Sequence, residues 1–177
     1  MANTTPSIAC LGVIGRNNNP LHITIFPSYD STTQTFIPVR TPLQFSLILS
    51  GTLDIFSRPP SNVLLTGDYG LLHAVDDRLA AYGFETNTGV KFVAVVDMRG
   101  RKGGGAGTAA GLRENELKPV FRAMQTAYVR LLQNPFYDPD ESKAGPGAPT
   151  AKRITSRRFG EEMRRIGEAW APGVTSL

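Results

Sequence analysis

The sequence predicts an α+β domain in which helices pack on the faces of a five-stranded antiparallel sheet. Two observations lead to this prediction. Short segments rich in apolar residues occur as a group of two and a group of three, each joined by tight turns, and three longer segments have helical periodicity. The order of two strands, one helix, three strands and two helices is typical of layered α+β domains. The 177 residues are enough for a single domain, which we take to span 1–177.

The first two strands are predicted at 8–15 and 21–26. The first segment, IACLGVIG, is short and apolar, and it ends at Gly15. The turn RNNNP follows, because Asn tolerates left-handed backbone geometry and Pro cannot continue a ladder. Apolar and polar side chains then alternate in LHITI, as in a half-buried strand. The two segments therefore predict a hairpin.

A polar loop is predicted at 27–40, and a helix is predicted to begin at Thr41 and to end before the Pro-Pro pair at 59–60. The side chain of Thr41 can accept a hydrogen bond from a free N–H of the first turn. Pro42 is suited to the first helical position because its φ angle is already helical.

This helix is apolar on more than one side. One stripe at helical spacing consists of Phe45, Ile48, Leu49 and Phe56. The apolar residues that fall largely outside that stripe are Leu43, Leu47, Leu53 and Ile55. A helix that lies on one sheet needs only one apolar stripe. The second apolar side therefore has to contact either more of this chain or a partner.

Three further strands are predicted at 69–76, 78–86 and 90–98, joined by short turns. The last segment, VKFVAVVDM, is β-branched and nearly all apolar, as expected of a central strand. The three segments predict an antiparallel meander that completes the sheet.

The rest of the chain is predicted to contain two helices separated by low-complexity segments. The composition of 99–111 and 138–151 predicts flexible insertions. A helix with one clean apolar stripe is predicted at 113–133, and a second at 156–168. The tail from 171 to 177 is expected to fray.

Composition excludes several classes of protein. The formal charge of +4 is too weak a bias to predict a nucleic-acid-binding protein. Cys10 is the only cysteine, so no internal disulfide can form and a reducing, cytoplasmic setting is expected. One cysteine and two histidines are too few for a structural zinc site, and no cofactor is predicted. No apolar run approaches the roughly 20 residues of a membrane-spanning helix.

Positive charge is concentrated near the C-terminus, at Lys152, Arg153, Arg157, Arg158, Arg164 and Arg165. Such a segment can contact anionic lipid, nucleic acid or an acidic protein surface. The simpler alternative is a solvated helix whose arginines form ion pairs with Glu161 and Glu162.

No combination of residues predicts an active site. The glycines of GGGAGTAAG are not closed by the Lys-Ser/Thr pair of a phosphate-binding loop, since Lys102 precedes them. Cys10 and His22 are the only pair that suggests a nucleophile and a base, and neither has an evident orienting carboxylate. Asp97, at a strand end, is more typical of a cap or a loop start. We therefore expect no catalytic residues.

Four segments, in chain order, resemble the sedlin family, in particular the subunit 2-like proteins of the trafficking protein particle (TRAPP) complex. They are IACLGVIGRNNNPLHI, YGFETNTGVKFVAVVD, LRENELKPVFRAMQTAYVRLLQNPFYDP and ITSRRF. The resemblance covers most of the chain, and NPFY after the helix is its most specific short match. It implies a longin-like, or profilin-like, fold, in agreement with the element order derived from periodicity.

The resemblance also implies a non-catalytic subunit of a vesicle-tethering complex. Such a subunit contacts other TRAPP subunits and acts in assembly of the complex, which activates Rab GTPases in transport between the endoplasmic reticulum and the Golgi. It would lie in the cytoplasm and peripherally on those membranes, with a possible membrane contact through the basic C-terminal helix. The alternatives are a longin-type regulatory or adaptor domain, and a basic module that binds lipid or nucleic acid.

The residues expected to bind a partner are Leu43, Gln44, Phe45 and Leu47, together with Phe136 and Tyr137. The first group lies at the start of the first helix, and Gln44 stands where the family commonly has an Asp. The two aromatic residues follow the stop of the long helix. Aromatic residues in that position either fix the helix end to the core or anchor an interface.

Overall fold

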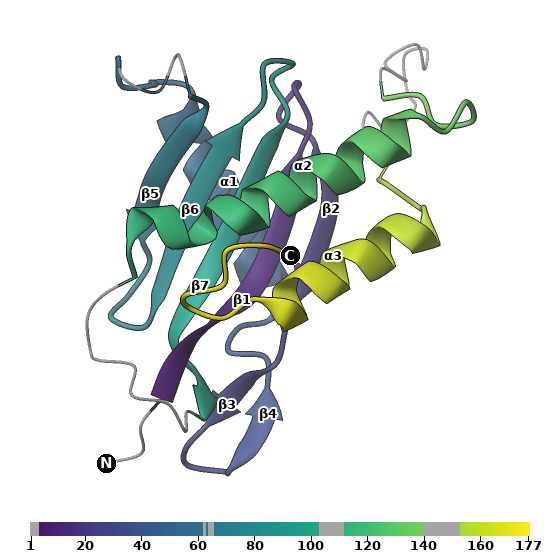
Figure 1. Cartoon of the computed structure of the whole chain (residues 1–177). Helices are drawn as coiled ribbons and strands as arrows, with labels where there is room; N and C mark the ends of the chain where they lie inside the picture. The colour runs from purple at the N-terminus through teal and green to yellow at the C-terminus, as the bar shows by residue number, and fades with distance from the viewer. Residues whose placement is uncertain (1–3, 62, 64–65, 103–111, 140–152) are drawn as a thin grey trace.

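The computed structural model describes residues 4–61, 63, 66–102, 112–139 and 153–177 (Figure 1). Its centre is an antiparallel five-stranded sheet in the order β2-β1-β7-β6-β5. The strands are β1 Thr4–Ile14, β2 Pro20–Ile25, β5 Asp68–Ala74, β6 Leu79–Glu85 and β7 Lys91–Lys102. The predicted hairpin, meander and five-stranded sheet are thereby confirmed, with β1 and β7 pairing at the centre.

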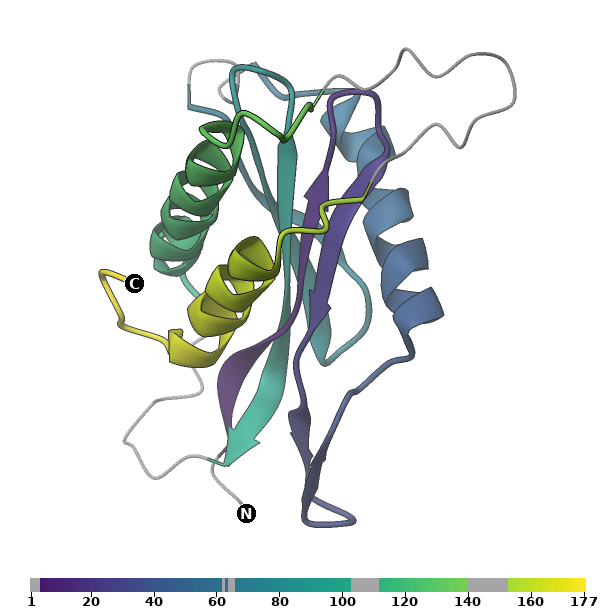
Figure 2. The ribbon, with the colours of Figure 1, turned by 90° about the vertical axis from the view of Figure 1, so that its right-hand side faces the viewer.

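Helices cover both faces of the sheet (Figures 1 and 2). One face carries α1, Pro42–Phe56, and the other carries α2, Lys118–Leu132, and α3, Arg157–Ala169. A single 3-10 turn, Glu114–Leu117, precedes α2. The result is a three-layered α+β domain of the longin-like type.

Each side of the sheet has its own apolar core. The α2–α3 side buries Phe92, Met124 and Trp170, and the α1 side buries Phe45 and Val95. The two cores form because successive residues of the central strands point to opposite faces. Nearly every position of β1 and β7 between their polar ends is therefore buried.

The prediction of a loop at 27–40 was wrong, because this segment contains a small hairpin. Strands β3, Ser28–Asp30, and β4, Thr35–Ile37, pair with each other outside the main sheet. The connecting turn begins at Asp30, whose carboxylate accepts a hydrogen bond from the backbone N–H of Thr32 at 2.9 Å. Strands of three residues within a Ser- and Thr-rich segment give no measurable periodicity, so the sequence did not indicate them.

Two strand boundaries also differ from the prediction. β1 begins at Thr4, and β7 extends to Lys102, so the two strands pair at Thr4 and Lys102. The flexible insertion predicted from residue 99 therefore begins at least four residues too early. The remainder, 103–111, lies outside the described residues, as does most of the insertion predicted at 138–151.

The C-terminal tail differs from the fraying that we expected. Trp170 is fully buried, and its indole N–H donates a hydrogen bond to the backbone oxygen of Glu116 at 2.9 Å. Leu177, the last residue, is partly buried against the same core. The chain beyond α3 thus lies on the domain because it has apolar contacts there.

Candidate protein-interaction surface

The first turn of α1 is fixed by a pair of reciprocal hydrogen bonds. The Thr41 hydroxyl accepts from the Gln44 backbone N–H at 3.3 Å, and the Gln44 side-chain oxygen accepts from the Thr41 N–H at 2.9 Å. This capping box satisfies two backbone donors that a helix start leaves free. Gln44, predicted to bind a partner, therefore has a role within its own helix, and the predicted start at Thr41–Pro42 is confirmed.

The inner face of α1 belongs to the core. Phe45 is fully buried, and Leu49, Thr52 and Phe56 are buried along the same stripe. Gly12 of β1 allows this close contact, because a side chain there would begin 2.7 Å from the Leu49 side chain. The expectation that Phe45 binds a partner was thus wrong, since helical spacing places it under the helix.

The outer face of α1 exposes two leucines. Leu43 is 70% exposed and Leu47 is 64% exposed, one turn apart. The hydroxyl of Ser46 donates to the Pro42 carbonyl at 3.0 Å, and that of Ser50 donates to the Ser46 carbonyl at 2.9 Å. Since these hydroxyls are bonded to the helix itself, the surface around the leucines is less polar than its sequence suggests. We call Leu43 and Leu47 the α1 leucine pair.

The rest of the second apolar side of α1 contacts this chain. Leu53 and Ile55 are partly buried against the α1-side core, as is Ile48 of the first stripe. Both alternatives for that side therefore apply: most of it packs within the domain, and only the α1 leucine pair is left to solvent.

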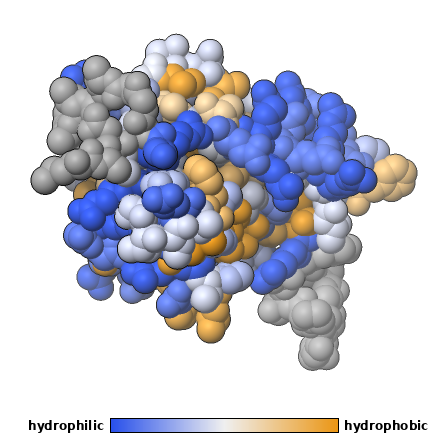
Figure 3. Space-filling view, turned by 90° about the horizontal axis from the view of Figure 1, so that it is seen from below, coloured by the Kyte–Doolittle hydropathy of each residue, from blue (hydrophilic) through white to orange (hydrophobic). Residues whose placement is uncertain are grey.

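The β3–β4 hairpin adds exposed apolar side chains that the sequence analysis missed. Phe36 and Ile37 are exposed on β4, five and four residues before the capping Thr41. Figure 3 shows the molecule from the end that carries the hairpin, with apolar patches lying among hydrophilic ones. The short TFI segment was a possible signal, although three residues are too few to establish alternation.

The two aromatic residues after α2 have different environments. Tyr137 is partly buried against the α2–α3 core, whereas Phe136 is 95% exposed. Val129 and Leu132, on the outer side of α2, are also exposed. Tyr137 thus fixes the helix end, and Phe136 is left free to contact another molecule.

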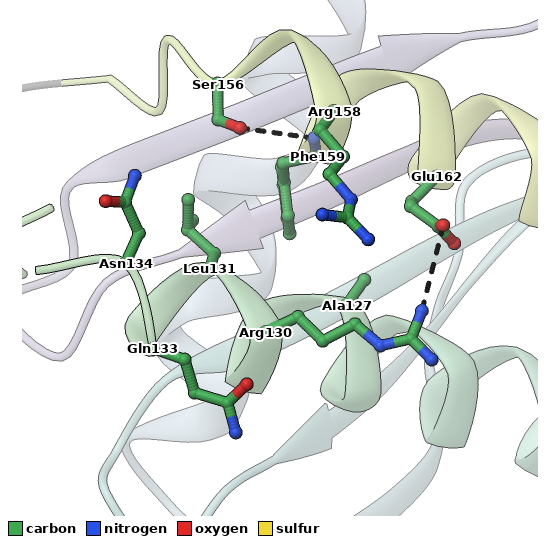
Figure 4. A pocket seen from close by; sticks show the side chains of 9 residues that line it. All are labelled: Ala127, Arg130, Leu131, Gln133, Asn134, Ser156, Arg158, Phe159 and Glu162. Atoms are coloured by element: carbon green, nitrogen blue, oxygen red, sulfur yellow. Dashed lines mark hydrogen bonds and ion pairs between the residues drawn. The ribbon is translucent and has the colours of Figure 1, made fainter.

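A cavity of about 480 Å³ lies between the end of α2 and the start of α3 (Figure 4). Within it, Arg130 of α2 reaches Glu162 of α3 at 3.8 Å, and Phe159 points into the space between the helices. The hydroxyl of Ser156 caps α3 by accepting from the Phe159 N–H at 3.3 Å. These groups hold α2 and α3 together, and none of them forms a nucleophile–base pair.

Cys10 and His22 are kept apart by the sheet. Cys10 points into the α1-side core, where burial raises the pKa of its thiol far above the ordinary value. His22 points to the α3 side, where its ring packs edge-on against Phe159 and Nε2 lies 2.8 Å from the Thr24 hydroxyl. Burial lowers the pKa of His22. The two side chains thus do not form a catalytic dyad.

Asp97 has a structural role. It is fully buried, and its carboxylate accepts two hydrogen bonds from the Arg78 guanidinium, at 2.7 and 2.8 Å. The same carboxylate accepts from the Arg99 backbone N–H at 2.9 Å, and Arg78 also donates to the Tyr29 carbonyl at 3.1 Å. The Arg78–Asp97 ion pair therefore joins β6, β7 and the β3–β4 hairpin.

The basic C-terminal segment is partly neutralised by its own glutamates. Arg157 contacts Glu161 at 2.9 Å, and Arg165 contacts Glu162 at 3.1 Å, each within α3. These are the ion pairs that the simpler alternative required. Lys152 lies outside the described residues.

Metal binding and membrane crossing find no support in the part of the chain that the structure describes. Among those residues, no three His, Cys, Asp or Glu side chains gather as metal ligands would. None of the helices there has both the length and the apolar character needed to span a bilayer.

Comparison with known proteins gives a family profile and individual relatives that agree with each other. The sequence profile of the family described as Sedlin matches residues 13–169. The trafficking protein particle complex subunit 2-like protein of Dictyostelium discoideum is 29% identical, over 90% of this chain and 95% of its own length. The proteins of the same name from Bos taurus and Mus musculus are 32% and 33% identical, over 82% and 85% of this chain and 96% and 89% of their own lengths.

Proposed function

Because this chain belongs to the sedlin family, we propose that it acts as a non-catalytic subunit of a trafficking protein particle complex. Its contribution is to bind other subunits and so to support assembly of the tether. Activation of Rab GTPases is then a property of the assembled complex, to which this chain contributes indirectly. The place of action is the cytoplasmic surface of Golgi and ER–Golgi membranes.

The α1 leucine pair is the structural observation that supports subunit binding in this proposal. α1 already covers its face of the sheet through Phe45, Leu49 and Phe56. Leu43 and Leu47 are therefore not needed for the core, and a partner that covered them would gain roughly 1.5–3 kcal/mol for each side chain removed from water. A rigid capped helix is also suited to presenting the pair without a large entropic cost.

The test is affinity purification of the tagged full chain from its own cells, followed by identification of the co-purifying proteins. The wild type is expected to recover subunits of the complex. Leu47→Asp places a charge in the interface and is expected to lose them, while the purified variant keeps the wild-type circular dichroism spectrum and melting temperature. Leu71→Asp is the matched control, because it makes the same change at an exposed leucine of β5.

Two outcomes contradict different parts of the proposal. If the wild type recovers no subunit of such a complex, the function itself is wrong. If the double variant of Leu43→Asp and Leu47→Asp recovers the same subunits in the same amounts as the wild type, the complex is right and the α1 surface is wrong.

A further inference from the structure

The outer edge of β2 is a strand edge whose hydrogen-bonding groups are largely unused. β2 is the last strand on its side of the sheet. An edge strand presents a row of N–H and C=O groups that can pair with another extended chain. Such an edge is functionally informative when the protein has not covered or distorted it.

Two hydrogen bonds establish which residues of β2 point outward. Phe26, the residue after β2, donates its N–H to Ala9 of β1 at 2.9 Å, so its backbone groups face β1. The backbone groups of Thr24 and His22, two and four residues earlier, face the same way. The Leu21 carbonyl accepts from the N–H of Ile154 at 2.8 Å, so Leu21 points outward. Since backbone direction alternates along a strand, the N–H and C=O of Ile23 and Ile25 also point outward. No described residue donates to or accepts from these four groups.

The bond between Ile154 and Leu21 shows that this edge accepts an extended segment. Residues 153–156 precede α3 and have no helical or strand assignment of their own. They contact the edge at Leu21 and then turn into α3 at Ser156. Among the residues that the structure describes, the chain thus uses the first outward position of β2 and leaves the next two open.

A groove of about 490 Å³ runs beside the open positions, between residues 22–25 of β2 and the side of α3. Gly160 forms part of its wall. A Cβ atom at 160 would lie 3.8 Å from His22, an ordinary van der Waals contact, so packing at the Cβ position does not require glycine there. Glycine inside a helix is nevertheless destabilising relative to Ala. Its effect here is to leave room beside the edge.

The groove has a basic character on its α3 side. Its charged lining residues are Arg157, Glu161 and Arg164. Arg157 pairs with Glu161, whereas Arg164 is exposed and has no acidic partner within the described part of the chain. His22 adds a polar ring on the same side. One positive charge is therefore left to meet an acidic group.

We propose that the β2 edge binds an extended segment of a partner protein as a sixth strand. The segment hydrogen bonds to the backbone of Ile23 and Ile25. Its apolar side chains lie on the α1 face, where Ile23 and Ile25 are only partly buried, and its acidic side chains lie on the α3 face, near Arg164. Strand addition of this kind derives affinity from the main chain and specificity from alternate side chains.

A second copy of this chain fits the edge less well than a peptide segment. A symmetric β2–β2 pair would place two α3 helices on the same face beside one joint, with both grooves occupied by the other copy's helix. It would also bring two grooves of the same net charge together. An isolated extended segment carries neither a helix nor that charge.

The probe is the synthetic peptide acetyl-Val-Glu-Val-Glu-Val-amide, added to the isotopically labelled full chain. Amide hydrogen exchange of Ile23 and Ile25, measured by NMR, is expected to slow when the peptide is present. The amides of His22 and Thr24 face β1 and are the internal control, since their exchange should not change. A peptide with Lys in place of Glu should protect less, and one with N-methylated central amides should not protect at all.

Variants of α3 test the contribution of the groove separately from that of the backbone pairing with β2. Arg164→Glu is expected to weaken the peptide about fivefold, the upper range for one exposed charge pair. Arg165→Glu is the matched control, because Arg165 pairs with Glu162 away from the groove. Gly160→Leu fills the groove and should abolish protection without lowering the melting temperature.

Three results would overturn the proposal. The first is unchanged exchange at Ile23 and Ile25 with millimolar peptide. The second is equal protection by the N-methylated peptide, since a main-chain ladder would then be absent. The third is protection of both amides in a dimer seen by analytical ultracentrifugation without peptide, which would make a second copy the occupant. None of these depends on the α1 leucine pair, so the proposed function can fail or hold independently.

Discussion

The two edges of the sheet are built differently. On the β5 edge, the pairing with β6 shifts twice, between Asp68 and Gly70 and between Leu71 and His73. Gly70 also has a positive φ of 60°. On the β2 edge, the pairing with β1 is continuous from His22 to Ile25. The difference teaches that the β5 edge is irregular along most of its length, whereas the β2 edge has a single register shift at its start and is regular from His22 onward.

Irregularity and regularity have opposite consequences for pairing. Bulges twist an edge away from an incoming strand, and this is one of the ways in which native proteins avoid unwanted association. The one register shift of this edge lies at Leu21, at the start of β2, and the segment His22–Ile25 beyond it has neither a bulge nor a lysine, arginine or acidic side chain. A regular, uncharged edge left open is a liability unless something covers it. We attribute its retention to a partner strand.

The largest expected effect concerns the half of the sheet that ends in the β5 edge. Arg78→Ala leaves Asp97 buried without its ion-pair partner, which is expected to cost roughly 3 kcal/mol of unfolding free energy. This is the lower end of the range because Arg78 is partly exposed. Urea unfolding measures the loss. Arg99→Ala is the control, since Arg99 lies 3.9 Å from an exposed Asp77 and should change stability little.

Amide hydrogen exchange of the Arg78→Ala variant would then compare the local stability of the two halves of the sheet. Amides of β6 are expected to lose protection before those of β2, because Arg78 directly precedes β6 and contacts β7 and the β3–β4 hairpin. Equal loss in β2 and β6 would show that the two halves of the sheet open as one unit.

A smaller effect is expected from truncating one apolar side chain on each edge strand, which compares how much each edge gains from packing against the α1-side core. Leu72 of β5 is buried, whereas Ile23 of β2 is only partly buried. Leu72→Ala is expected to cost about 2–3 kcal/mol and Ile23→Ala about 1 kcal/mol, because the transfer and cavity terms grow with burial. Thermal unfolding of the two variants tests this order. The reverse order would mean that β2 is the better anchored edge.

The smallest effect is a pH dependence near the β2 edge. Burial lowers the pKa of His22 below its ordinary value of 6.5. Between the lowered pKa and 6.5, the unfolded chain binds more protons than the folded chain, so stability falls as the pH drops below about 6.5. His22→Asn should flatten this part of the stability curve. Measurement of unfolding free energy against pH in both proteins decides it, and identical slopes would exclude a contribution from His22.

The main elements of the fold were predictable because their signals are local. The alternation in LHITI, the β-branched run at 90–98 and the stripe of 113–133 each identify one element from its own residues. Thr41 and Pro42 likewise located the start of α1. The β3–β4 hairpin was missed because its short strands depend on contacts with β7 and Arg78 that lie far away in sequence.

The candidate surfaces were only partly predictable, for a related reason. Helical spacing showed that α1 has a second apolar side, but the prediction grouped Phe45 with Leu43 and Leu47 although its spacing belongs to the inner stripe. The open edge of β2 was not predictable at all. Its availability depends on strand order and on the single bond from Ile154, and neither can be read from residue types.

The buried indole of Trp170 has a practical consequence. It is the only tryptophan in the chain, and it sits where the end of α3 meets the 3-10 turn before α2. Its fluorescence emission therefore comes from one dry, hydrogen-bonded position. A red shift of that emission would report that water has reached the contact between the end of α3 and the turn before α2. The measurement requires no added dye.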